Sequence, residues 1–531
     1  MQISLRILFL IQPKKLKNKN SSGLDGVSTN LLKSILSIII APLCHIFNLS
    51  FKSGFIPTIM KTAKVVPVYK SGDKHIFTNY RPISLLSSIS KLLEKIAAVQ
   101  IMRYLNKFKL LYDHQYGFRR YHNTTHPLLH FLDNIYKSFN KPNPEYSMGF
   151  FIDLKKAFDT CDFNILLRKL NHYGFKGVSN KWFENYLKGR QQYTFINGVK
   201  SNLKELSCGV PQGSILGPIL FLILINDLPN ASKSFFTLLF ADDTTLQMSS
   251  SSLDDLIRKA NDELKSVSDW FRANKLTLNI SKTKFMLFNP FKDKKLDYSK
   301  LKLSIENINI DRIGKDCEMN SFKFVGVKID ENLNWESQLS HVKNKLLSAN
   351  YAIAKMKNIL PAQTKLKIYN SLFRSHLEYG IIAWGCFSEV KINQLVSIQK
   401  KVIRNIAGVK YNTHTDPLFT KFKILKAPDL LQLNMNVFMY NYDGGKVPPS
   451  FNNFFTRLNS YDRSKNFCLN IARNKKLHKF PSYYLPKLWN ALSLEIKRST
   501  SLNVFKSKCK DLFFSSYNNP CTARFCYVCS N

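Results

Sequence analysis

The stretch Phe240-Ala241-Asp242-Asp243 places two adjacent carboxylates where a strand-forming run reverses direction. Residues 234–240 predict one buried strand and residues 244–248 its return, so both aspartates fall at a hairpin tip. An isolated pair of this kind is typical of a solvated turn. The alternative is a pair held together by divalent cations, which take carboxylate oxygens as ligands.

A third carboxylate lies upstream, where the apolar run Tyr146 to Ile152 ends at Asp153. Residues 154–159 predict the start of a helix, so capping that helix is the alternative role for Asp153. If the strand lay beside the hairpin, the three carboxylates could hold two cations roughly 3.5–4 Å apart, as in phosphoryl-transfer enzymes. Between them, residues 209–218 predict a glycine-rich turn that lets backbone approach a flat ligand, followed by an apolar helix over 219–228.

Three segments together resemble the reverse transcriptases of non-LTR (LINE-type) retrotransposons, near the jockey and CR1-like groups: Phe151 to Asp159, Val210 to Pro218, and Phe240 to Asp243. Other segments resemble further blocks of the same family, so the likeness covers nearly all of the chain: Ser22 to Gly26, Asn79 to Leu86, Gln115 to Arg119, Asn274 to Lys284, Phe324 to Val327, His376 to Gly380, and Leu488 to Leu492.

The resemblance implies an α+β right-hand polymerase with fingers, a palm carrying an antiparallel sheet, and a helical thumb. It divides the chain into a basic N-terminal tail (1–21), fingers-like region (22–145), palm (146–335), helical thumb (336–430) and basic C-terminal region (431–531). In the thumb, a basic helix is expected to grip a template–primer duplex through phosphates, with a membrane surface as the alternative, and it carries an apolar stripe: Leu395, Ile398, Val402 and Ile406. Residues 475–487 interleave basic and aromatic side chains, which suits stacking on single strands.

The implied activity is that of an RNA-directed DNA polymerase, which extends a DNA 3′-hydroxyl with dNTPs. Asp153 and Asp242 would share two Mg²⁺ ions, with Mn²⁺ as an alternative, and Asp243 would bind more loosely or orient the primer end. Ala241 would line the nucleotide site. Lys282 would protonate the leaving pyrophosphate, and Lys284 is the alternative donor two positions on.

An aromatic side chain five residues after the first aspartate selects deoxyribonucleotides in this family, because it leaves no room for a 2′-hydroxyl. Here that residue is Phe158. The alternative is a core residue that shares one helix face with Phe163 and Leu166. Asp159 is expected to be solvated or to lie at the helix start.

The remaining nucleotide contacts implied by the resemblance are polar. Gln212 would touch the nucleotide or a template base through its amide, and Gly213 would permit the close approach. Arg81 and Lys70 would bind the triphosphate, Arg81 because its planar group pairs with two phosphate oxygens. The alternative for both is a basic loop face without a particular ligand.

Charge supports a polyanionic partner. The chain has 78 Lys+Arg against 36 Asp+Glu, a formal charge of +42, and such a field attracts nucleic acid. Apolar runs such as 37–42 and 219–225 are far shorter than the ~20 residues that span a bilayer. We therefore expect RNA template and DNA primer or target as partners, no membrane partner, and localisation in the nucleus and cytoplasm.

Ten cysteines are scattered along the chain, which favours reduced thiols over a disulfide framework. Cys521, Cys526 and Cys529 lie close together, but three thiols are one short of a structural zinc site. Cys509 or His478 could supply the fourth ligand. The irregular spacing favours a tail without zinc.

No segment before Ser22 has room for an endonuclease domain. We therefore expect the polymerase portion of an element, with a separate endonuclease as a further partner. The histidines His114, His122 and His126 are expected to contact template or to pack rather than to form a nuclease. Two other functions stay open: a non-catalytic RNA-binding protein, and a telomerase-like or intron-maturase enzyme, against which the family-like tail argues.

Overall fold

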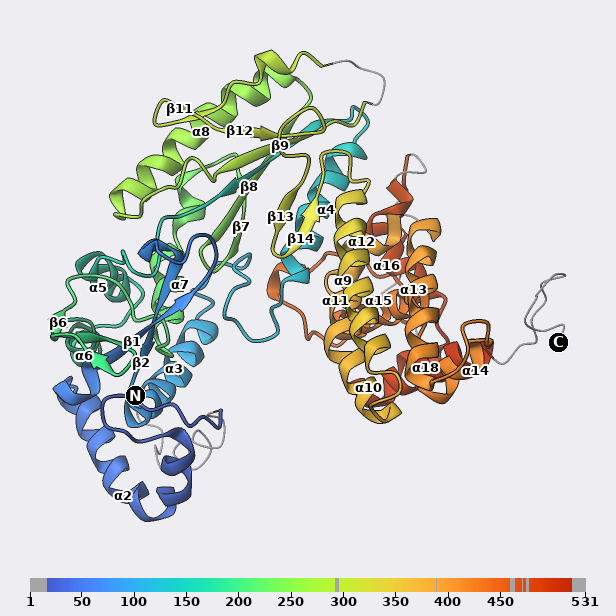
Figure 1. Cartoon of the computed structure of the whole chain (residues 1–531). Helices are drawn as coiled ribbons and strands as arrows, with labels where there is room; N and C mark the ends of the chain where they lie inside the picture. Colours follow the sequence, from blue (N-terminus) through green and yellow to red (C-terminus); the bar gives the residue numbers. More distant parts are fainter. Residues whose placement is uncertain are drawn as a thin grey trace, which may run out of the picture.

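A computed structural model describes residues 17–291, 296–387, 389–458, 464–469, 471–473 and 477–517. Figure 1 shows the N-terminal helices in blue, a green sheet above them, and a separate group of orange and red helices on the other side. The three C-terminal cysteines and residues 474–476 lie outside the described residues.

The central sheet has five strands in the order β12-β9-β3-β8-β7. All neighbours pair antiparallel except β12 and β9, which are parallel. This confirms the expected α+β class with an antiparallel sheet. The strands are β3 (Tyr146–Ile152), β7 (Phe236–Phe240), β8 (Asp243–Ser250), β9 (Lys284–Phe288) and β12 (Asp311–Ile313).

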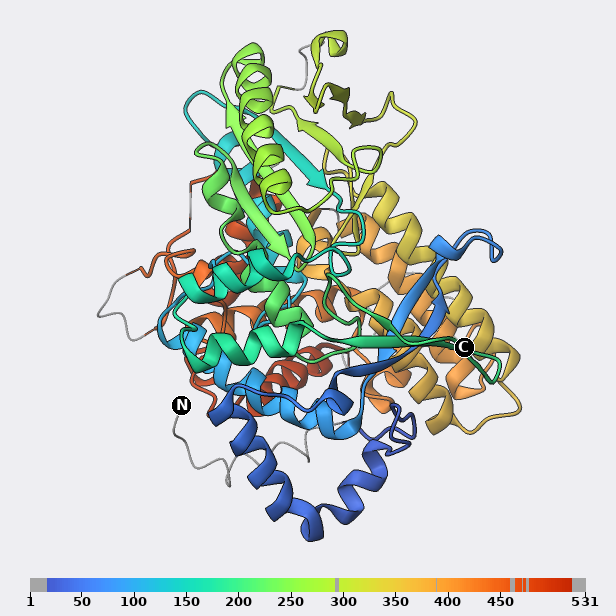
Figure 2. The same cartoon turned by 90° about the vertical axis from the view of Figure 1, so that its left-hand side faces the viewer.

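Strand β3 is buried on both faces, so its alternate side chains enter two different cores. Phe151 packs with Phe131 of α4 (Thr125–Phe139), whereas Phe150 packs with Phe285 in the cluster that includes α7 (Gly217–Ile225). Gly149 faces α4, where a Cβ would lie 2.9 Å from the ring of Phe131. Helix α8 (Leu253–Ala273) runs along the sheet (Figure 2).

A second sheet, β2-β1-β4-β5 with β6 beside β4, belongs to the N-terminal region. Strand β4 pairs in parallel with β1, so a strand from the range predicted as palm completes a sheet of the range predicted as fingers. The strands are β1 (Thr62–Tyr69), β2 (Tyr80–Leu85), β4 (Gln191–Ile196), β5 (Val199–Lys200) and β6 (Lys204–Glu205); the helices of this region are α2 (Thr29–Ser53), α3 (Ser88–Lys107), α5 (Phe163–His172) and α6 (Val178–Leu187).

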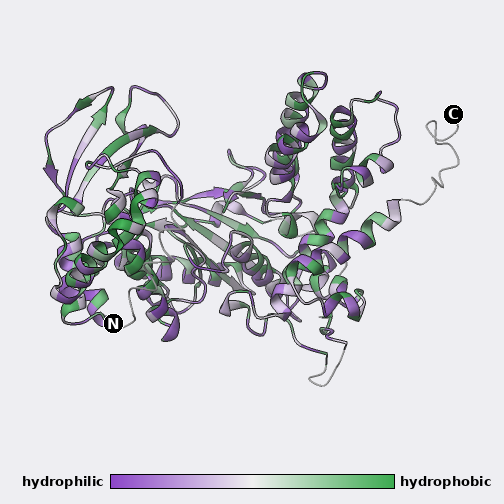
Figure 3. Ribbon diagram, turned by 90° about the horizontal axis from the view of Figure 1, so that it is seen from below, coloured by the Kyte–Doolittle hydropathy of each residue, from purple (hydrophilic) through white to green (hydrophobic). Residues whose placement is uncertain are grey.

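The C-terminal region is helical, and its helices show hydrophobic and hydrophilic sides in Figure 3. The predicted apolar stripe lies on α13, and Leu395, Ile398, Val402 and Ile406 are all buried. The larger helices are α9 (Glu336–Lys355), α13 (Glu389–Ala407), α15 (Ala427–Asp443), α16 (Pro481–Asn490) and α18 (Leu502–Tyr517); shorter ones are α10 (Ala362–Ile368), α11 (Ser375–Glu378), α12 (Ile381–Trp384), α14 (Asp416–Lys421) and α17 (Leu494–Lys497).

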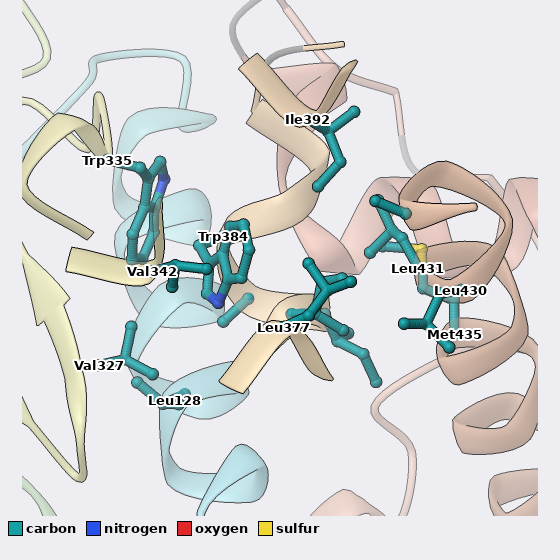
Figure 4. Packing of buried hydrophobic residues seen from close by; sticks show 14 of the residues in the cluster. Leu128, Val327, Trp335, Val342, Leu377, Trp384, Ile392, Leu430, Leu431 and Met435 are labelled. Carbon is teal, nitrogen blue, oxygen red and sulfur yellow. The ribbon is translucent and has the colours of Figure 1, made fainter. Parts of the chain in front are cut away.

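One hydrophobic core joins the central sheet to these helices. Figure 4 shows Leu128 of α4 and Val327 of β14 (Val327–Ile329) close to Trp384 of α12, with Leu431 of α15 beyond. Burial of this kind contributes ~25 cal/mol per Å² of apolar surface, so the helical region is held against the sheet by packing rather than by a linker alone.

Helix α2 requires a correction to the apolar runs considered above. Within the described part of the chain it is the one helix long and apolar enough to cross a membrane by length and composition. The count of uninterrupted runs missed it because Lys33, His45 and Lys52 interrupt it. The helix contains Pro42 and is bent (Figure 2), and Leu32 and Phe47 are buried in the core shared with α3 and α6. The absence of a membrane partner stays a prediction.

The histidines of residues 114–130 form an aromatic cluster in which His126 and His130 are buried against residues 451–454, while His114 and His122 are partly buried. The ring of His130 lies 4.2 Å from that of Phe451, and the ring of His126 lies 5.2 Å from it. Burial is the main reason that the pKa of each histidine is lowered, to about 4 for His114 and His122, about 3 for His126 and about 2 for His130. The cluster therefore packs in its neutral form, as one of the two expectations had it.

Acid should destabilise the protein through this cluster. Because the folded-state pKa values lie below the ordinary value, stability is complete above pH ~6.5 and falls as the unfolded chain takes up protons below it. Each fully buried histidine costs about 1.4 kcal/mol per pH unit in that window. The free energy of unfolding, measured by urea titration, should fall less steeply between pH 7.5 and pH 4.5 for His130→Phe than for the parent. An unchanged slope would mean that His130 is not held neutral, and exposed His75→Phe is the matched control.

Candidate nucleotidyl-transfer site

The two adjacent aspartates lie where the sequence placed them, at the tip of the β7–β8 hairpin. Phe240 pairs with Asp243, so Ala241 and Asp242 form a two-residue loop. Ala241 has a φ of 58°, a left-handed conformation that a two-residue hairpin of this type requires at its first position. Ile152 pairs with Thr244 in the adjacent strand. Asp153, which follows Ile152, therefore emerges beside the tip.

Asp153 is held by the segment that leads into β9. Asn279 donates its side-chain amide to Asp153 Oδ2 at 2.7 Å, and its backbone N–H to the Asp153 carbonyl at 2.8 Å. The backbone N–H of Asp153 donates to Thr283 Oγ1 at 3.2 Å. The helix expected from residue 154 was wrong: Leu154 forms a β-bridge with Leu278, residues 155–160 form bends and turns, and α5 begins at Phe163 with Asp162 as its cap. Helix capping by Asp153 is thereby excluded.

The electrostatics of the tip are those of crowded carboxylates. Burial, and then the charge of Asp153, raises the pKa of Asp242, while Lys70 and Arg81 oppose the shift. For Asp243, burial and then the charges of Asp242 and Asp153 raise the pKa to about 6. Asp243 is nevertheless exposed to solvent. We therefore attribute its raised pKa more to the two neighbouring carboxylates than to burial. A cation among the three would relieve this repulsion.

The three carboxylates fit divalent cations in kind, because hard cations prefer carboxylate oxygens. Across the residues that the structure describes, no group of three His, Cys, Asp or Glu is arranged to hold a metal ion as it stands. The bond from Asn279 occupies one oxygen of Asp153. Cation binding would therefore require a small movement of these side chains.

The glycine-rich turn docks between two other segments. Gln212 donates its side-chain amide to both carboxylate oxygens of Asp159, at 2.9 and 3.1 Å, and its carbonyl accepts the Ser84 N–H at 2.8 Å. Gly213 has a φ of 132°, and a Cβ there would lie 2.4 Å from the Ser84 carbonyl oxygen. The close approach that the sequence predicted at Gly213 is thus made to strand β2, and Gln212 is fixed by Asp159.

Phe158 lies beside this glycine-rich turn, where its carbonyl accepts the Val210 N–H at 2.8 Å. Its ring stacks on Phe221 of α7 at 4.6 Å, and the side chain is only partly buried. The alternative of one helix face shared with Phe163 and Leu166 was wrong, because the helix begins after Phe158. Phe158 therefore packs one face of its ring against the core while the side chain stays partly exposed, and its role in sugar selection stays a prediction.

The basic residues predicted for the triphosphate lie on the β1–β2 hairpin. Arg81 pairs with Val68 in that hairpin, and the Lys70 N–H donates to the Asn79 carbonyl. Both side chains are exposed, and both charges act on Asp242. Binding of the triphosphate by Arg81 and Lys70 stays a prediction.

Between the two candidate proton donors, the structure favours Lys282. Lys284 is engaged, because its ammonium donates to the Ser281 carbonyl at 2.6 Å and to Asp311 at 2.5 Å. The side chain of Lys282 is exposed. Its role as a proton donor stays a prediction.

The sequence analysis gave no role to Asn279 and Gln115, and its expectation for Asp159 was wrong, because that partly buried carboxylate accepts the Gln212 amide before α5 begins. Gln115 accepts the backbone N–H groups of Gly117 and Ala241 at 2.8 and 3.1 Å. Each of the three side chains forms a hydrogen bond with a residue more than 50 positions away along the chain. Their presence inside recognisable motifs was the available signal, but spacing does not reveal such contacts.

Comparison with known proteins gives a consistent family. Residues 68–329 match the family model described as "Reverse transcriptase (RNA-dependent DNA polymerase)". The chain is 27% identical over 410 residues to "Probable RNA-directed DNA polymerase from transposon BS" of Drosophila melanogaster, covering 75% of this chain and 44% of that protein. It is 24% identical over 431 residues to "RNA-directed DNA polymerase from mobile element jockey" of the same organism, covering 79% and 45%. The chain thus spans less than half the length of these relatives.

A solved structure of telomerase from Candida tropicalis, in complex with a fragment of telomeric RNA, is also similar. It covers 78% of this chain and 70% of that chain at 14% identity, with a TM-score of 0.37. At this TM-score the likeness carries no argument about this chain.

Gly213→Ala should damage the site more than an equivalent change elsewhere. The added Cβ would collide with the Ser84 carbonyl, and the φ of 132° is unfavourable for alanine. Gly198→Ala is the matched control, because its φ of 86° carries backbone strain without any atom within 4 Å. We expect Gly213→Ala to lower the urea midpoint well beyond Gly198→Ala. Equal effects would show that the contact with β2 is dispensable.

Proposed function

We propose that this chain, whose residues 68–329 match the reverse transcriptase family model, extends a DNA 3′-hydroxyl with dNTPs on an RNA template as the polymerase part of a non-LTR retrotransposon protein. The relatives that support this proposal are longer proteins, so it concerns the segment that they share.

The observation that carries the proposal is the register of the central sheet. The pairing of Ile152 with Thr244 brings Asp153 beside the Asp242-Asp243 tip, and the pKa of Asp243 is raised by both other carboxylates. Such a concentration of negative charge opposes binding of a nucleotide triphosphate unless cations offset it. A non-catalytic RNA-binding surface would gain nothing from three crowded carboxylates.

Asp153, Asp242 and Asp243 would hold the two divalent cations. When bound, Mg²⁺ offsets phosphate charge and polarises the attacking 3′-oxygen. Arg81 and Lys70, exposed on the β1–β2 hairpin, would bind the triphosphate. Lys282 would donate a proton to the departing pyrophosphate oxygen.

Two further residues of the site, Phe158 and Gln212, would position the substrate. Phe158, backed by Phe221, would exclude a 2′-hydroxyl from the sugar position. Gln212 is already held by Asp159, so it would meet the nucleotide or template base in a fixed orientation. Fixed polar groups of this kind lower the cost of reorganisation during the reaction.

The partners follow from the same proposal. They are an RNA template, a DNA primer or target, and dNTPs, with strand cutting left to a separate endonuclease. The formal charge of +42 supports binding to both nucleic acids. We propose that the protein acts in the nucleus and cytoplasm.

Asp242→Asn should abolish incorporation and spare binding. The change removes a charge that the cations require, so Mg²⁺-dependent dNTP incorporation on a primed RNA should fall below about one-hundredth of the parent rate. Template affinity, measured by fluorescence anisotropy, should change less than about twofold, because phosphate contacts supply it. The control is Asp254→Asn, an exposed carboxylate on α8.

Two outcomes would contradict the assignment. An Asp242→Asn protein that polymerises at the parent rate would remove Asp242 from the site. A parent that binds primed RNA but incorporates nothing would favour the non-catalytic RNA-binding alternative.

Phe158→Val should relax sugar selection. The smaller side chain opens space beside Phe221, so the ratio of rNTP to dNTP incorporation should rise about tenfold or more. Phe163→Val, a core substitution on α5 in the same cluster, is the matched control and should leave the ratio unchanged. If the ratio stays at its parent value in active Phe158→Val protein, the residue serves packing alone.

A further inference from the structure

One exposed aromatic residue lies beside the site and has no assigned role. Phe118 is 55% exposed, and its backbone φ is 55°. A bulky residue in the left-handed region is an outlier, and such outliers persist where surrounding structure imposes them. An exposed ring gains little from burial, so packing does not account for this conformation.

The segment before Phe118 is tied to the aspartate tip. Gln115 forms an isolated parallel bridge with Leu239 of β7, and its side-chain oxygen accepts the N–H groups of Gly117 and Ala241. A Cβ on Gly117 would lie only 2.3 Å from the Ala241 nitrogen. Phe118 is therefore fixed with respect to the loop that carries Asp242.

The segment after Phe118 is anchored as well. Arg119 donates its guanidinium to the Tyr112 carbonyl at 2.7 Å and to the Gln115 carbonyl at 3.3 Å. The Arg119 side chain thus turns back into the protein, while Phe118 turns outward. The strained backbone at Phe118 is held from both sides.

The ring of Phe118 meets the ring of Phe158 edge to face. Their centroids are 6.4 Å apart and their planes are 86° apart. Phe158 also stacks on Phe221 of α7. The rings of Phe118 and Phe158 therefore form a right-angled corner, in which Phe158 is backed by the core and Phe118 is exposed. This corner lies next to the Ala241-Asp242 loop.

We infer that Phe118 is a second aromatic contact for the incoming nucleotide, adjacent to Phe158. The inference rests on the proposed polymerase function, and it adds a binding residue to that site. The nucleotide is favoured over the template strand because the ring contacts Phe158 and its backbone is bound to the aspartate tip. Aromatic contacts of this kind contribute without regard to which base is present.

The test separates nucleotide binding from duplex binding. The full chain, as parent and as Phe118→Ala, is assayed for kcat and KM with each dNTP on primed RNA, and for the Kd of primed RNA without nucleotide. We expect the KM to rise about tenfold for all four dNTPs, with kcat and Kd within about twofold of the parent. Phe118→Tyr should restore the parent KM, since it keeps the ring.

Phe108→Ala is the matched control, because Phe108 is 54% exposed at the end of α3; its KM should equal that of the parent. Urea midpoints identify any variant that fails to fold, and Phe118→Tyr then carries the comparison with a parent-like KM expected. A parent-like KM in folded Phe118→Ala would overturn the inference. A raised Kd with unchanged KM would also overturn it, and would make Phe118 a contact to the duplex. A parent that incorporates nothing would instead refute the proposed function itself.

Discussion

Mutual repulsion among Asp153, Asp242 and Asp243 is the constraint on which the rest of the site depends. The β3–β8 ladder and the two-residue tip bring the three together, and burial with neighbouring charge raises the pKa of Asp242 and Asp243. Backbone hydrogen bonds impose this arrangement at a cost in electrostatic energy. The charges of Lys70 and Arg81 on the β1–β2 hairpin oppose the shift at Asp242, and bound cations would oppose it further.

The surrounding contacts keep these groups in place from several directions. Asn279 holds Asp153, Gln115 holds Ala241, and the turn at Gln212 and Gly213 binds both Asp159 and strand β2. The two sheets are therefore joined at the site rather than hinged away from it. Helix α4 then connects the central sheet to the C-terminal helices through the core of Figure 4. A shift of the N-terminal sheet or of the C-terminal helices would therefore displace the aspartate tip.

The sequence predicted the buried strands, the hairpin and the stripe on α13 because these are local patterns, whereas the overall architecture was implied by the resemblance to the family. The α+β right-hand polymerase fold agrees with the family match. Local periodicity failed at residues 154–160, where Leu154 bridges Leu278 and Lys155 donates its backbone N–H to the Thr277 carbonyl instead of forming a helix turn, and at α2, where charged residues interrupt a long apolar helix. The partners Asp159, Asn279 and Gln115 act across long sequence separations, so spacing alone could not identify them.

Divalent-cation binding measured against pH tests the central claim most directly. Isothermal titration of the protein with Mn²⁺ should show affinity that rises with pH until Asp243, with its pKa of about 6, is ionised, and then levels off. Asp153→Asn keeps the shape of the side chain and removes one charge, so its Mn²⁺ affinity should fall at least about tenfold at pH 7.5. Equal affinities for the parent and Asp153→Asn, without pH dependence, would contradict a site built from these three carboxylates.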